Sequence, residues 1–278
     1  MFLQGKIQQD HRQLLQYLLE LRNCMYLKIQ CISNARTQKA LKSIFETTES
    51  CHAAIGQLCL QEQTYSAPVF ALMRTLLESV ISILAFCKAP DDRAAMYKNF
   101  QAVLRWRLAV LLSRNLGCWL VADTNDQRQK NDTGRAVTAS ELRNCGIEYL
   151  SRRKRSQHCL EKALCEGDES AFRKTWYPES RRELLTDYQV GWTYDVLYTP
   201  LCSHVHADTF ATQLLTRLDK GNALTLASTL YEFGLWALTE RFKELSVSSK
   251  QKRFLNLARK KLTAHNPGSS MENADSKG

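Results

Sequence analysis

The sequence predicts an all-α protein, a multi-helix bundle built around one central apolar helix. Its 278 residues include only 11 Gly and 5 Pro, a poor supply of turn formers for a sheet of many short strands. Apolar residues recur at steps of three and four along most of the chain, which is the spacing of one helix face. Neither a glycine-rich dinucleotide-binding turn nor a P-loop occurs, so these nucleotide-binding motifs are excluded.

The N-terminal part is predicted to form three helices. The first two cover about 8–33 and 36–62, each with one apolar face. The third covers about 68–88, where Pro68 suits a first helical turn. This third helix is apolar almost all round, a pattern typical of a helix in the middle of a bundle.

That central helix approaches membrane-spanning length, but it contains Arg74 and Glu78. Charged residues are costly at the centre of a bilayer. We therefore expect a buried core helix and no membrane partner.

The rest of the chain is also predicted to be helical, with one long polar interruption. The run 123–135 contains no apolar residue and is expected to be a surface loop or the seam between two halves. The predicted helices cover about 92–116, 138–165 across the basic cluster, and 209–262 with a break near Gly221. We expect two helical halves, 1–120 and 137–264, packed as one domain, followed by a disordered tail at 265–278.

Positive charge is concentrated in two stretches. The formal net charge is +10. Residues 128–155 contain eight Lys or Arg against three Asp or Glu, and residues 241–261 contain eight against one. These stretches are either solvated helix faces or surfaces for RNA, DNA or another polyanion.

Compartment and cofactors are also predicted. The first ten residues lack the apolar run of a secretory signal peptide, so we expect a cytoplasmic protein. Ten scattered cysteines never form a Cys-x-x-Cys pair, which favours buried small apolar residues over a zinc site. No metal and no cofactor are expected.

Two groups of polar residues interrupt apolar faces. Arg74 and Glu78, four positions apart, share one face of the central helix and can pair. Near Tyr198, Pro200 opens a helical turn on which Ser203 and His206 share a face. A hydroxyl beside an imidazole is suited to acid-base or nucleophile-base chemistry, although a satisfied core histidine has the same pattern.

These motifs, with an aromatic-rich stretch containing Trp176 and Arg182, resemble an uncharacterised group of bacterial all-helical proteins held as a domain of unknown function. The resemblance covers roughly residues 64–206. It implies that the Arg/Glu helix and the Ser/His turn meet in one polar centre. It also suggests kinship with HEPN domains, metal-independent ribonucleases of toxin and defence systems that act at a dimer interface. Their Arg-x4-6-His motif is missing here, so Arg74 would have to supply the arginine from another helix.

We therefore expect an RNA-acting effector of a bacterial defence or toxin system, with Arg74, Glu78, Ser203 and His206 as catalytic residues. Tyr198 and the basic residues would contact the RNA, the latter being Arg152, Arg153, Lys154 and Arg155. A homodimer and a partner protein from the same defence system are further expectations. Two alternatives stay open: a non-catalytic scaffold or partner-binding protein whose Arg/Glu and Ser/His residues form a structural polar core, and DNA binding through the basic C-terminal helix.

Overall fold

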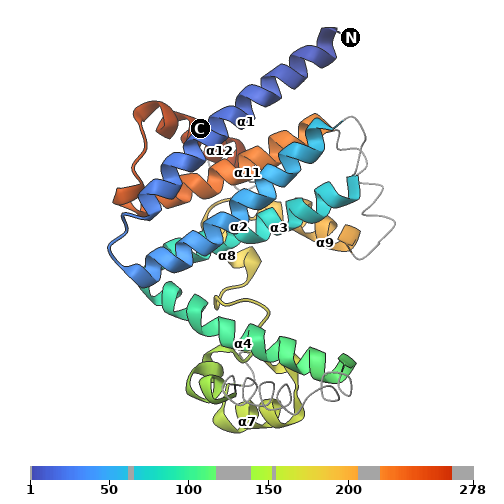
Figure 1. The fold of residues 1–278 in the computed structure, drawn as a ribbon, viewed down its shortest axis with the longest axis vertical. Coiled ribbons are helices and arrows are strands. Elements are labelled where there is room, and N and C mark those ends of the chain that lie inside the picture. Colours follow the sequence, from blue (N-terminus) through green and yellow to red (C-terminus); the bar gives the residue numbers. More distant parts are fainter. Residues whose placement is uncertain (1, 62–65, 117–138, 152–154, 206–219, 265–278) are drawn as a thin grey trace, which may run out of the picture. The chain divides into compact units, whose positions relative to one another are not determined.

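A computed structural model describes residues 2–61, 66–116, 139–151, 155–205 and 220–264. It confirms the all-α prediction (Figure 1). Within those ranges the only extended pairing is one isolated antiparallel bridge, between Leu150 and Phe172. The chain forms two compact units. Residues 1–91 and 179–278 make up the first, and residues 92–178 make up the second.

The first unit is a bundle around α3 (Ser66–Lys88), which contacts four other helices. These are α2 (Ala35–Leu60), α8 (Arg181–Asp187), α9 (Thr199–Val205) and α11 (Lys220–Arg241). Two more helices, α1 (Phe2–Ile29) and α12 (Ser249–Thr263), pack on α2 and α11 respectively. Figure 1 shows α2, α3 and α11 side by side.

The central position of α3 follows from its composition. Apolar side chains on nearly every side of the helix are buried, Leu76, Val80 and Leu84 among them with no exposed surface. The segment Ala67–Lys88 is long and apolar enough to cross a membrane, yet 67% of its most apolar window is buried inside the protein. This is the burial that a core helix has, as the sequence predicts.

The second unit combines α4 (Pro90–Leu116) with short elements: a 3₁₀ turn at Gly146–Tyr149, α7 (Gln157–Glu166) and a turn at Glu169–Ala171. One arginine of α4 holds the last turn in place. The Arg107 guanidinium donates to the carbonyls of Glu169, Phe172 and Arg173 at 2.9 to 3.4 Å. The carbonyls of an irregular turn are thereby satisfied without a sheet.

Two expectations about the helices are corrected. The helix predicted over 138–165 is interrupted, because the chain leaves it for the 3₁₀ turn and Ser156 caps a new helix by accepting from the Cys159 amide. The helix predicted over 209–262 is broken at 242–248, where Ser248 and Gln251 form a capping box that starts α12. The break predicted near Gly221 adjoins residues 206–219, which lie outside the described residues, and α11 begins at Lys220.

The apolar stepping of α4 continues through Leu104, Leu108 and Leu111, but these residues are not buried. They are 42 to 55% exposed. The predicted seam at 123–135 and the tail at 265–278 lie outside the described residues. The expected halves, 1–120 and 137–264, therefore stay a prediction.

Polar groups are also buried beneath α11. His52 Nε2 lies 3.1 Å from Ser228 Oγ, and the imidazole stacks on Tyr231 at 4.6 Å between ring centroids. Burial lowers the pKa of His52 to about 4, so the ring is neutral. One turn beyond Ser228, Glu232 is 6% exposed beside a cavity of about 70 Å³. Burial raises the pKa of Glu232 to about 8, so its carboxyl is protonated at neutral pH.

Glu232 makes the stability of the first unit depend on pH between about 4.5 and 8. Its pKa is higher in the folded chain than in the unfolded chain, so its contribution is complete below about pH 4.5 and is lost as the pH rises through about 8. We expect the free energy of unfolding of the wild type to fall by on the order of 4 kcal/mol between pH 5 and pH 9, and we expect Glu232→Gln to abolish this fall. Urea denaturation across this range measures it. The control is Glu240→Gln, an exposed position on the same helix; equal pH slopes for the two variants would contradict the prediction.

Candidate functional site

The polar face of α3 carries the predicted Arg74 and Glu78 pair. Arg74 Nη2 lies 3.6 Å from Glu78 Oε1, one helical turn away. Their side chains are 26% and 32% exposed. Both charges therefore border solvent, although they belong to the helix that forms the centre of the bundle.

A second arginine reaches the same carboxylate from α8. Arg181 Nη2 lies 3.4 Å from Glu78 Oε1, and its side chain is 25% exposed. Arg181 is the first residue of α8, a position set by a capping box in which Ser180 and Glu183 exchange hydrogen bonds. The neighbouring Arg182 points elsewhere and pairs with an aspartate.

Tyr198, which follows both arginines in the sequence, completes the group. Its hydroxyl donates to Glu78 Oε1 at 2.9 Å. The Arg181 guanidinium lies over its ring at 5.2 Å, and Tyr194 stacks on it at 5.2 Å between centroids. Burial raises the pKa of the Tyr198 phenol, and the Glu78 carboxylate raises it further. The phenol is therefore a proton donor at physiological pH.

A π-helical turn, Tyr194–Tyr198, positions that phenol. The Thr199 amide donates to the Tyr194 carbonyl, five residues back, and the Thr199 hydroxyl bonds to the same oxygen. Pro200, which has no amide hydrogen, follows in the first turn of α9. A regular α-helix cannot run through this junction with all its bonds, and π-turns are frequent at functional sites.

We call Arg74, Glu78, Arg181 and Tyr198 the Glu78 cluster. It contains two guanidinium groups and one carboxylate, which leaves one positive charge in excess. The Nε atoms of Arg74 and Arg181 are buried and have no hydrogen-bond partner, and each guanidinium has five N–H donors. Among the residues that the structure describes, Glu78 is the only ionic partner of either arginine. The cluster can therefore bind an oxyanion.

Most of the other predicted site residues cannot be compared with this cluster, because they lie outside the described part of the chain. His206 lies outside the described residues, and so do Arg152, Arg153 and Lys154. Ser203 belongs to α9, but its side chain is not described. Arg155 lies in the second unit, where its Nη2 donates to the Glu148 carbonyl at 3.2 Å.

Sequence reasoning missed Arg181. The run Ser180-Arg181-Arg182-Glu183 is a readable capping signal, and it predicts that a helix starts there. Which of the two arginines turns toward α3 depends on how α8 packs on α3, a contact between residues about one hundred positions apart. Local sequence patterns carry no such information.

One comparison with known proteins gives a match. The model of a family of unknown function, DUF5677, matches residues 47–222, a range that contains the whole Glu78 cluster. Comparisons with curated proteins and with solved structures give no match.

Tyr198→Phe tests the hydrogen bond at the centre of the cluster. The variant keeps the ring stack but leaves the Glu78 oxygen without its shortest donor. Hydrogen bonds to charged groups contribute about 1.5–3 kcal/mol, and partial exposure of Glu78 reduces this, so we expect a loss of about 1 kcal/mol in the free energy of unfolding. Urea denaturation measures it beside Tyr194→Phe, which keeps the same stack and should be close to neutral. Equal effects of the two variants would refute the assigned bond.

Proposed function

The chain belongs to a family of unknown function, DUF5677, and we propose that it acts on RNA, with the Glu78 cluster engaging the phosphate at which the strand is cut. The observation that carries the proposal is the convergence of Arg74 and Arg181 on one carboxylate oxygen at the protein surface. Guanidinium groups bind phosphate through paired N–H donors. The side chains of both arginines are about a quarter exposed.

The proposed reaction is a metal-independent cleavage in the manner of the HEPN domains that the sequence resembles. The ribose 2′ oxygen attacks the neighbouring phosphorus, and the bond from phosphorus to the 5′ oxygen breaks. His206 takes the 2′ proton and returns one to the departing 5′ oxygen. Arg74 and Arg181 stabilise the negative charge that develops on the phosphoryl oxygens. Glu78 holds both guanidinium groups in place.

Two predicted residues have supporting roles in this proposal. Tyr198 donates to Glu78 and fixes its orientation, and Ser203 is a polar contact for the substrate. The basic residues Arg152 to Arg155 hold the strand by its phosphates. An effector of a bacterial toxin or defence system, working as a homodimer or with a partner protein, is the biological setting that the HEPN resemblance suggests.

A specific observation favours a second candidate, a non-catalytic polar core. The Tyr198 hydroxyl is satisfied by Glu78, and the residue is 7% exposed, as in a buried structural network. If this candidate holds, alanine at Glu78 lowers stability because two guanidinium groups lose their counter-charge. No variant of the cluster would then change the cleavage of RNA.

Incubation of the purified protein with total RNA separates these candidates. We expect cleavage by the wild type and a loss of roughly 10²-fold or more in the rate for His206→Ala and Arg181→Ala. Arg182→Ala is the matched control, because it removes an adjacent arginine that is 64% exposed and paired with Asp195 outside the cluster. Thermal unfolding should place His206→Ala within about 1 kcal/mol of the wild type.

The same assay can reject the proposal. Intact RNA with wild-type protein, or equal cleavage by Arg181→Ala and Arg182→Ala, excludes a role of the Glu78 cluster in cleavage. Loss of folding in His206→Ala excludes the catalytic assignment of that histidine. Expression in a bacterial host gives a second readout, since a toxin slows growth in the wild-type form and not as His206→Ala.

A further inference from the structure

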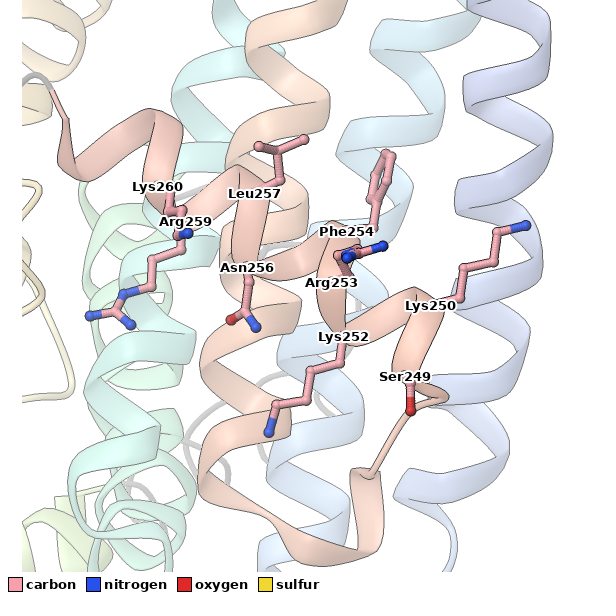
Figure 2. A pocket seen from close by; sticks show the side chains of 9 residues that line it. All are labelled: Ser249, Lys250, Lys252, Arg253, Phe254, Asn256, Leu257, Arg259 and Lys260. Atoms are coloured by element: carbon pink, nitrogen blue, oxygen red, sulfur yellow. The ribbon is translucent and has the colours of Figure 1, made fainter.

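Helix α12 is the most basic helix in the part of the chain that the structure describes. Its fifteen residues include no acidic residue. They include six cations: Lys250, Lys252, Arg253, Arg259, Lys260 and Lys261. An open hollow of about 1010 Å³ lies along the helix and is lined by most of these side chains (Figure 2).

Some of these cations have partners within the protein. Lys252 Nζ lies 3.2 Å from a Glu240 carboxylate oxygen, and the Arg259 guanidinium lies 4.7 Å from the centre of the Trp236 ring. Figure 2 shows both side chains on the same side of the helix. These two cations therefore contribute to the docking of α12 on α11.

A second row of cations is exposed and has no acidic partner among the described residues. Lys250, Arg253, Leu257 and Lys260 follow one another at steps of three, four and three, so they lie on one face of the helix. We call these four residues the α12 face. From Lys250 to Lys260 the face extends for ~15 Å along the helix axis. It presents three unneutralised charges to solvent.

We propose that the α12 face binds the phosphate backbone of a base-paired RNA segment. The inference rests on the proposed action on RNA and adds the form of RNA that is held. A duplex carries one negative charge per ~1.7 Å of its axis, about twice the density of one of its strands. A short row of cations therefore gains most from a duplex.

The absence of a stacking surface on the α12 face also favours paired RNA. Proteins that bind unpaired bases stack them on exposed aromatic rings. The one aromatic ring of α12, Phe254, packs on Tyr17 at 4.6 Å between centroids. The exposed apolar side chain of the face is aliphatic, since Leu257 is 50% exposed. The α12 face therefore offers cations to phosphates but no aromatic ring to unstacked bases.

An anionic membrane fits this helix less well. A helix that lies in a membrane surface inserts a wide apolar face among the lipids. The apolar side chains of α12, Leu255, Ala258 and Leu262, are at most 3% exposed and belong to the core of the first unit. Only Leu257 remains for insertion. The capping box at Ser248 fixes the start of the helix, so the face is formed before any ligand binds.

Fluorescence anisotropy with the full chain tests the proposal. The probes are a 20-base-pair 2′-O-methyl RNA duplex, which cannot be cleaved at the 2′ oxygen, one strand of that duplex, and a DNA duplex of equal length. Vesicles with 30% phosphatidylserine form a fourth arm, measured by co-sedimentation. The variant is Lys250→Ala/Arg253→Ala/Lys260→Ala. The control variant is Arg36→Ala/Lys39→Ala/Lys42→Ala, which removes two exposed cations and one partly buried cation of α2 and changes the net charge equally.

We expect the RNA duplex to bind more tightly than its single strand. The α12 variant should weaken duplex binding by about tenfold or more and lower the slope of log K against log salt by about 2 to 3, while the α2 variant leaves both nearly unchanged. Tighter binding of the single strand, tenfold preference for the DNA duplex, recruitment to vesicles without duplex binding, or equal losses in the two variants would each overturn it.

These outcomes are separable from failure of the proposed function. If a short single-stranded RNA is cut in an Arg181-dependent manner but the duplex does not bind, only the α12 inference fails. If the duplex binds through the α12 face but Arg181→Ala leaves RNA cleavage unchanged, the role proposed for the Glu78 cluster fails instead.

Discussion

The first unit depends on covering a helix that is apolar on almost every side. A helix of this kind is stable in water only when neighbours surround it, and α3 obtains them from both ends of the chain: α2 before it and α8, α9 and α11 long after it. The segment from 92 to 178 forms a separate unit between these parts of the chain. Burial of α3 is thus the constraint that brings residues near 75 and residues near 190 together.

The Glu78 cluster is a result of the same constraint. Arg74 and Glu78 interrupt the apolar surface of α3, so whatever packs beside them must supply polar partners. The neighbours that do so are Arg181 at the start of α8 and Tyr198 before α9. One carboxylate neutralises only one of the two arginines, so the cluster keeps one excess positive charge. A structural ion pair would need only one arginine.

Much of the fold could be predicted from local sequence, and most of the cluster could not. The apolar pattern of α3 and the spacing of Arg74 and Glu78 are visible over a few turns. The helix predicted over 138–165 gives way to a 3₁₀ turn, after which Leu150 pairs with Phe172, and the contact of Arg181 with Glu78 depends on the packing of α8 on α3. Both are contacts between distant parts of the chain, and periodicity within one segment has no bearing on them. Leu104, Leu108 and Leu111 show the same limit, because the spacing of apolar residues identifies a helix face but not whether another element packs against that face.

The π-helical turn before α9 makes the cluster sensitive to chain length. A π-turn accommodates one residue more than an α-helical turn, and each residue of an α-helix rotates the chain by about 100°. Removal of one residue between Tyr194 and Tyr198 would remove the extra residue of the turn and would carry the phenol away from Glu78 by about that angle. The turn thus works as a spacer whose length is fixed by the cluster. Relatives with the same cluster should tolerate substitutions in it, Val196 at its exposed middle above all, but not insertions or deletions.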